Sequence, residues 1–166
     1  MPTRRQVLSM LAAAAATAAI PPVYAAPGTH ARKVHLFSKH LQWLDYGPMA
    51  ETAAKIGFDG IDLTVRPKGH VLPENVERDL PRAVAAIREN GLVADRITVA
   101  ATDPDDPLTL KILETAASLD IGIYRMGWLK YDRDRPIPEQ LDAYRAQLEK
   151  LAQINERLGI HGAYQN

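Results

Sequence analysis

The sequence feature that most constrains the fold is an alternation of strand-like and helix-like segments that recurs about every 30 residues. Consecutive strands joined by helices must run in parallel, because each crossover returns the chain to the same end of the sheet. The pattern therefore predicts an α/β fold with one parallel sheet. Runs of strand-like composition predict five strands, at 33–40, 58–65, 92–101, 121–129 and 160–166. Apolar spacings of three and four predict four helices, at 47–57, 73–91, 108–120 and 138–158.

Proline, glycine and aspartate mark the ends of these predicted helices. Gly57 and Gly159 follow the last periodic residues of two helices, where glycine commonly ends a helix. Asp106 and Pro107 form a capping and opening pair in front of the third helix. Pro81 lies inside the second helix, so we expect that helix to bend or to restart there.

Two architectures fit five parallel strand–helix units. A repeat of this length is the one expected when roughly 250 residues form the eight units of a TIM barrel. The alternative is a doubly wound open sheet, in which a glycine-rich phosphate-binding turn often follows the first strand. No G-x-G-x-x-G turn and no phosphate-binding P-loop occurs in the sequence, which favours the barrel.

The first 25 residues are typical of a targeting segment rather than of a folded domain. Arg4 and Arg5 precede a short alanine-rich apolar stretch, and small residues end it at Ala25. This arrangement resembles a bacterial twin-arginine signal peptide, which exports a protein already folded. The stretch is too short and too weakly apolar for a stable membrane anchor. We therefore expect a signal peptide at 1–25, a linker at 26–33 and an exported, periplasmic or secreted protein.

Composition excludes several kinds of chemistry. Lysine and arginine together number 20, as do aspartate and glutamate, so the chain lacks the basic excess of a nucleic-acid-binding protein. The absence of cysteine excludes disulfides and thiolate zinc sites. Histidine, carboxylate, amine, guanidinium, hydroxyl and amide groups must therefore supply the chemistry.

Three segments carry a resemblance to a known family. "GFDGIDLTVRPKGHV" is the most specific, with "LFSKHLQWLDY" before it and "GAYQN" at the end. Together they resemble the xylose isomerase-like TIM-barrel family, the sugar phosphate isomerases and epimerases. The resemblance covers residues 34–166 and implies an eight-stranded barrel. We therefore expect an incomplete TIM barrel of about five of the eight strands, truncated after strand five.

The resemblance also implies a divalent metal, Mn²⁺ or Mg²⁺, at the mouth of the barrel. The family typically places a glutamate ligand at the end of strand five, where this sequence has Gln165. An amide oxygen lacks the charge that dominates binding to these cations. The remaining Asp, His and Glu ligands of the family belong to later strands, so we expect this chain by itself to be inactive.

Candidate substrate-binding residues follow from their places at strand ends, where barrels hold their active sites. His40 follows the first strand and either contacts a sugar or bonds to backbone at the rim. Alternation directs Asp62 and Arg66 toward the barrel interior, where Asp62 either pairs with Arg66 or Arg96 or binds substrate hydroxyls. His70, on the following loop, is suited to acid–base work.

Strand four contributes further candidates at its carboxyl end. Arg125 and Trp128 lie on it, and Lys130 and Tyr131 follow, where either could contact substrate or polarise a carbonyl. His161 precedes the centre of strand five, and we expect it to pack rather than to react.

The favoured hypothesis is a sugar or sugar-phosphate isomerase or epimerase, acting on a small-molecule sugar. A non-catalytic secreted sugar-binding or accessory barrel is the main alternative, because an amide stands at the expected ligand position. An abasic-site endonuclease of the same barrel type is disfavoured by the neutral charge. A truncated product without independent function is also compatible with the sequence, and so is an oligomer.

Overall fold

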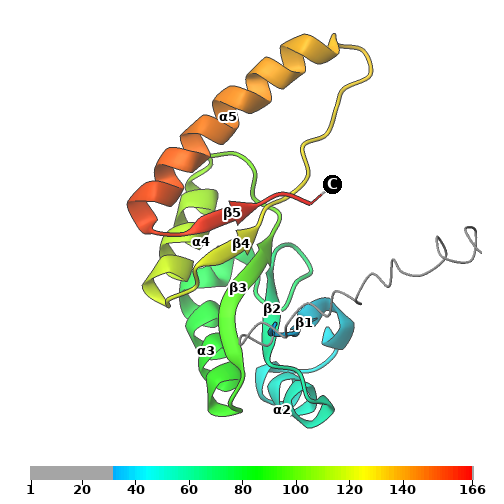
Figure 1. Ribbon diagram of the computed structural model, residues 1–166, viewed down its shortest axis with the longest axis vertical. Helices are drawn as coiled ribbons and strands as arrows, with labels where there is room; N and C mark the ends of the chain where they lie inside the picture. Colours follow the sequence, from blue (N-terminus) through cyan, green and yellow to red (C-terminus); the bar gives the residue numbers. More distant parts are fainter. Residues whose placement is uncertain (1–31, 166) are drawn as a thin grey trace, which may run out of the picture. The chain divides into compact units, whose positions relative to one another are not determined.

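A computed structural model describes residues 32–165, which contain five parallel strands in the order β1-β2-β3-β4-β5. Figure 1 shows these strands side by side, with α2 and α5 at opposite ends of the sheet. The strands are β1 His35–Phe37, β2 Gly60–Val65, β3 Val93–Val99, β4 Ile123–Arg125 and β5 His161–Ala163. The helices are α2 Tyr46–Ile56, α3 Val76–Glu89, α4 Pro107–Ser118 and α5 Ile137–Leu158, with short 3-10 helices η1 Ser38–Leu41 and η2 Pro73–Asn75. The prediction of an α/β fold built from parallel strand–helix units is confirmed.

Each helix crosses between neighbouring strands and packs on the next helix, α2 on α3, α3 on α4 and α4 on α5. The β2 strand shows how the sequence directs this packing. Its apolar residues Ile61, Leu63 and Val65 are completely or almost completely buried in the core that the helices share. The polar residues that alternate with them lie on the other face, as expected for a strand whose two faces meet different surroundings.

All five strands are shorter than the sequence predicts, and β1, β4 and β5 have only three residues each. The first ends at Phe37, because the buried hydroxyl of Ser38 accepts the backbone N–H of Thr64 at 2.9 Å and so takes the place of a ladder carbonyl. The fourth covers only Ile123–Arg125, and Gly127 follows with its backbone against the carbonyl of Ala100, where no side chain fits. Glycine beside a strand commonly marks such a close approach of two backbones.

The second helix was expected to bend or to restart at Pro81, and the restart is wrong: α3 runs from Val76 to Glu89 without a break. Pro81 removes one hydrogen bond inside the helix. The buried residues Leu80, Val84 and Ile87 hold the helix against the core on both sides of it. The other expected ends are confirmed: Asp106 caps α4 and Gly159, in the left-handed region at φ +67°, ends α5.

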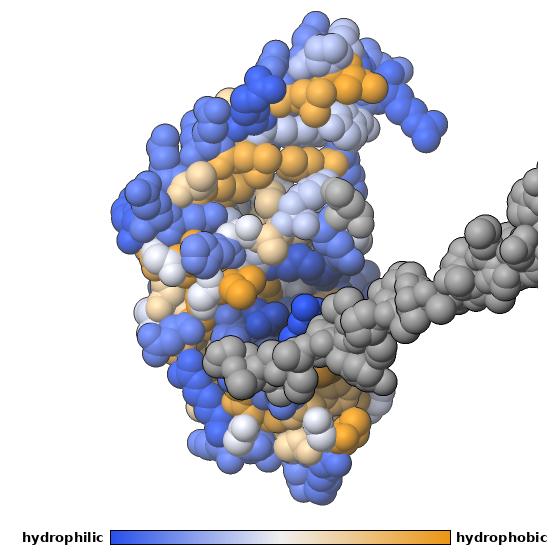
Figure 2. Space-filling view, viewed as in Figure 1, coloured by the Kyte–Doolittle hydropathy of each residue, from blue (hydrophilic) through white to orange (hydrophobic). Residues whose placement is uncertain are grey.

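Apolar side chains also reach the surface. Figure 2 shows them gathered over α5 and the loop before it, where Ile137, Leu141 and Leu148 are exposed. None of the helices within residues 32–165 combines the length and the apolar character needed to cross a membrane. The predicted signal peptide and most of the predicted linker lie outside the described residues.

Candidate functional site

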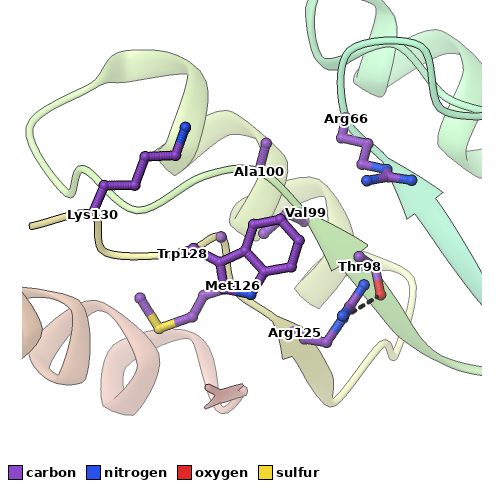
Figure 3. Close-up of a pocket in the computed structure, with 9 residues that line it drawn as sticks. Arg66, Thr98, Val99, Ala100, Arg125, Met126, Trp128 and Lys130 are labelled. Atoms are coloured by element: carbon purple, nitrogen blue, oxygen red, sulfur yellow. Dashed lines mark hydrogen bonds between the residues drawn. The ribbon is translucent and has the colours of Figure 1, made fainter. Parts of the chain in front are cut away.

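The carboxyl ends of β2, β3 and β4 border a cavity of about 220 Å³, shown in Figure 3. In parallel α/β folds this end of the sheet is where loops and strand ends bring reactive side chains together. The cavity is smaller than a typical pocket for a drug-sized ligand, so it suits a small molecule. It is lined by Arg66, Thr98, Val99, Ala100, Arg125, Met126, Gly127, Trp128 and Lys130.

A chain of hydrogen bonds runs from beneath the cavity to its wall. The Thr98 hydroxyl donates to the carboxylate of Asp62, with distances of 2.8 and 3.0 Å to its two oxygens. The Nε–H of Arg125 in turn donates to the Thr98 hydroxyl at 3.2 Å. Asp62, Thr98 and Arg125 come from three adjacent strands, so the pairing of these strands alone brings the hydrogen-bonded side chains together.

The expected ion pair of Asp62 with Arg66 or Arg96 is not formed within residues 32–165. Arg96 donates instead to its neighbour Asp95, with 2.8 Å between Nε and Oδ1. Burial raises the pKa of the Asp62 carboxyl above its ordinary value, opposed by the Thr98 hydrogen bond and the charges of Arg125 and Arg96. Asp62 is therefore a half-buried acceptor that is held by a hydroxyl rather than by a salt bridge.

Two arginines meet at one aromatic ring. The guanidinium carbon of Arg125 lies 5.1 Å from the ring centroid of Phe37, and that of Arg66 lies 5.9 Å from the same centroid. Both distances are within the range of cation–π attraction. Arg66 directly follows β2 and Arg125 ends β4, so the Phe37 ring contacts one side chain from each of these two strand ends.

His70 is held by the protein on both of its ring nitrogens. Its Nε2 lies 3.2 Å from the carbonyl oxygen of Leu41, and its Nδ1 lies 3.2 Å from the Ser38 hydroxyl. A carbonyl only accepts, so Nε2 carries the proton, and in the neutral ring Nδ1 accepts from Ser38. Burial lowers the pKa of His70 below its ordinary value. The structure therefore places His70 as a tie between the loop after β2 and the end of β1, away from the cavity.

The remaining sequence candidates lie at three different places. The exposed His40 packs edge-on against Phe37, with 6.0 Å between ring centroids. Lys130 lines the cavity, whereas Tyr131 turns away to pack on Tyr144 and borders a separate apolar groove along α5. Of the predicted site residues, Arg66 and Lys130 thus meet at the cavity, with Asp62 beneath it.

The end of β5 does not fit a divalent cation. The side-chain oxygen of Gln165 accepts a hydrogen bond from Nη1 of Arg125, so the amide that was considered as a metal ligand faces a guanidinium. A permanent positive charge there opposes a second cation. Within the part of the chain that the structure describes, no group of three or more His, Asp or Glu side chains is placed to hold a metal.

Sequence reasoning overlooked Thr98 and Phe37 and gave Arg125 no role. The signal for Thr98 and Arg125 is the register of the parallel strands: Thr98 pairs with Thr64 on one side and with Arg125 on the other. Strand order therefore predicts that these side chains share a face. Phe37 gives no comparable signal, because a single aromatic residue at a strand end is ordinarily interpreted as part of the hydrophobic core.

Comparisons with known proteins agree on the fold. No family model matches the sequence, and no curated protein matches it. Among solved structures, 3-keto-D-glucoside 4-epimerase from E. coli matches with a TM-score of 0.59 and 16% identity, over 81% of this chain and 56% of that one. A xylose isomerase-like TIM barrel protein from Mycobacterium smegmatis, in complex with magnesium, matches with a TM-score of 0.57 and 13% identity, over 80% and 54%.

These matches show that the five units have the arrangement of part of a TIM barrel. The chain spans little more than half the length of each of the two structures. At such identities the likeness concerns the fold alone.

Proposed function

We propose that this chain forms the sugar-binding part of an isomerase or epimerase of the xylose isomerase-like type. The observation that carries the proposal is the cavity at the carboxyl ends of β2–β4, where hydrogen-bond donors stand beside an exposed aromatic ring. Arg66, Arg125 and Lys130 supply the donors, and Trp128, which is 63% exposed, supplies a flat apolar face for a sugar. The fold-level likeness to an epimerase supports the choice of reaction.

The cations suit the chemistry of such enzymes. Isomerases and epimerases move a proton next to a carbonyl, and negative charge develops on the carbonyl oxygen as the proton leaves. A guanidinium or ammonium already directed at that oxygen stabilises this charge. We assign this role to Lys130, at the open side of the cavity, and a binding role to the two arginines. We propose that this chain binds sugar without turning it over by itself.

Calorimetric titration of neutral pentoses and hexoses into the chain tests the proposal. We expect saturable binding of at least one sugar, which Trp128→Ala weakens, because the aromatic face is lost. Tyr131→Ala is the matched control, since Tyr131 borders the groove along α5 instead of the cavity. Failure of every sugar to bind the unaltered chain rejects the proposed function.

A non-catalytic sugar-binding protein is the second candidate, and the contact between Gln165 and Arg125 favours it. A protein of this class binds sugar with the same affinity in the presence of Mn²⁺ and in the presence of a chelator. Sugar binding that tightens with Mn²⁺ and weakens again with chelator decides for part of a metal-dependent enzyme.

We further propose that the protein is exported through the twin-arginine pathway. The arginine pair and the apolar stretch behind it support this, and the proposal requires that the chain fold before export.

A further inference from the structure

Arg66 lines the cavity and has a hydrogen-bond donor to which the described residues offer no acceptor. Its side-chain Nε is buried and has no hydrogen-bond partner among residues 32–165. A buried donor without a partner costs about 1–3 kcal/mol, so such groups call for an explanation. No acidic residue lines the cavity. An acceptor that comes from outside the chain therefore meets the guanidinium of Arg66 at the cavity wall, beside its enclosed Nε.

Arg125 brings a second guanidinium to the same place. Its Nε is bound to Thr98 and its Nη1 to Gln165, and these two contacts fix the plane of the group. Figure 3 shows Arg66 and Arg125 on one side of the Trp128 ring and Lys130 on the other. Two like charges drawn to one aromatic ring repel each other, and an anion between them removes that repulsion.

The negative charge of Asp62 beneath the cavity limits how much negative charge the bound anion needs to carry. Asp62 lies under the arginines and is joined to Arg125 through Thr98. Lys130 lies across the Trp128 ring, so at the arginine end of the cavity two guanidiniums and the ionised Asp62 leave a single net positive charge. A carboxylate monoanion balances that charge, whereas a phosphate dianion exceeds it. The planar fork of a guanidinium also matches the two oxygens of a carboxylate.

We propose that Arg66 and Arg125 bind the carboxylate of an acidic sugar, a uronate or an aldonate, whose ring or chain lies against Trp128. This rests on the proposed function, because it names the class of sugar that the same cavity takes. The carboxylate accepts from the guanidinium of Arg66 and from the guanidinium edge of Arg125 that Thr98 and Gln165 leave free. Lys130, across the indole, then faces the far end of the sugar.

Calorimetry with matched pairs of acidic and neutral sugars tests the inference. The probes are D-glucuronate, D-galacturonate and D-gluconate against D-glucose and D-galactose, at constant ionic strength, with D-glucose 6-phosphate as the phosphate arm. We expect at least one acid to bind tenfold or more tightly than its neutral counterpart. Arg66→Gln and Arg125→Gln abolish this preference. Arg133→Gln, an equal loss of charge in the exposed loop before α5, leaves the preference unchanged.

A second measurement separates the anion subsite from the sugar site. We expect acetate, compared with chloride at equal ionic strength, to shift the NMR signal of the Arg66 Nε–H saturably, and Arg66→Lys to lose acid preference despite its charge. Equal binding of acidic and neutral sugars overturns the inference and leaves the proposed function standing. Tighter binding of glucose 6-phosphate than of every acid overturns the choice of carboxylate. An acetate response without binding of any sugar overturns the proposed function and keeps the anion subsite.

Discussion

At the scale of single residues, the direction of one hydrogen bond organises the site. An ionised carboxylate carries no proton, so the Thr98 hydroxyl must donate to Asp62 and can only accept from Arg125. Asp62 thereby orients the guanidinium of Arg125 through Thr98 without touching it. Asp62 is a positioning residue, and this explains why a half-buried carboxylate is kept on the interior face of β2.

Thr98→Val tests this chain of contacts with almost no change of shape. The valine leaves the Asp62 carboxylate half-buried without its donor, and we expect the free energy of unfolding at pH 7 to fall by about 1–3 kcal/mol. Loss of the hydrogen bond raises the pKa of Asp62 further, so the cost shrinks toward pH 4, where the carboxyl becomes protonated in the folded state. Urea unfolding at pH 7 and at pH 4 measures the loss of unfolding free energy caused by Thr98→Val. An equal cost at the two pH values contradicts the assignment.

His70 gives the fold a dependence on pH. Its pKa is lowered by burial, so the unfolded chain binds the proton more readily than the folded one. Its contribution to stability is therefore complete above about pH 6.5, the ordinary value, and is lost as the pH falls toward the folded pKa. We expect this loss to disappear in His70→Gln, as measured by urea unfolding from pH 5 to 8. The exposed His40→Gln serves as the control and keeps the wild-type profile.

Part of the site could be predicted at the residue scale. Strict alternation along β2 placed Arg66 and Asp62 on the interior face, and both are found there. Lys130 and Tyr131, however, follow the end of β4 in a segment without regular structure, where alternation no longer applies. Neighbours in sequence there reach different surfaces, which only the path of the loop decides.

At the scale of elements, strands and helices were predictable because the apolar periods are strong, and so were the helix ends marked by Asp106 and Gly159, but the strand ends were not. The end of β1 depends on a side chain: Ser38 takes the N–H that a ladder carbonyl would otherwise accept. The continuity of α3 through Pro81 depends on burial of the residues around it. Both outcomes come from contacts distant in sequence, such as that of Ser38 with Thr64, which a local pattern does not contain.

The start of α4 is a local feature and allows a local test. The Asp106 carboxylate accepts the backbone N–H of Leu108 at 2.9 Å, as a helix cap does. We expect Asp106→Ala to lower the free energy of unfolding by about 1 kcal/mol, through loss of the cap. Asp134→Ala removes an exposed carboxylate from the loop before α5 and is expected to change it by less than about 0.5 kcal/mol. Thermal unfolding compares the two, and an equal effect of both contradicts the capping role.

At the scale of the whole molecule, the site exists only when the sheet is complete from β1 to β5. The site draws on all five strands: contacts join Asp62 on β2 to Thr98 on β3, and Thr98 to Arg125 on β4. Arg125 in turn contacts Gln165 beyond β5 and Phe37 at the end of β1. The order of the strands, rather than any one motif, brings the cavity together. This explains why no short segment of the sequence identifies the site.

The proposed export depends both on a complete fold and on the first 25 residues. The twin-arginine pathway carries folded proteins, so we expect passage to need both the arginine pair and an intact core. Replacing Arg4 and Arg5 by lysine together is expected to reduce the periplasmic protein to background, as measured by cell fractionation and immunoblotting. Leu63→Asp buries a charge in the core and is expected to stop export as well, because the chain no longer folds.

The matched control swaps two neighbouring basic side chains outside the arginine pair, as Arg32→Lys with Lys33→Arg. We expect it to leave export unchanged. Continued export of the double-lysine variant contradicts the twin-arginine assignment. Export of the Leu63→Asp chain with loss of export in the double-lysine variant contradicts the link to folding instead. The two variants thus test separately whether the leader selects the pathway and whether the five-stranded sheet is formed before the chain leaves the cytoplasm.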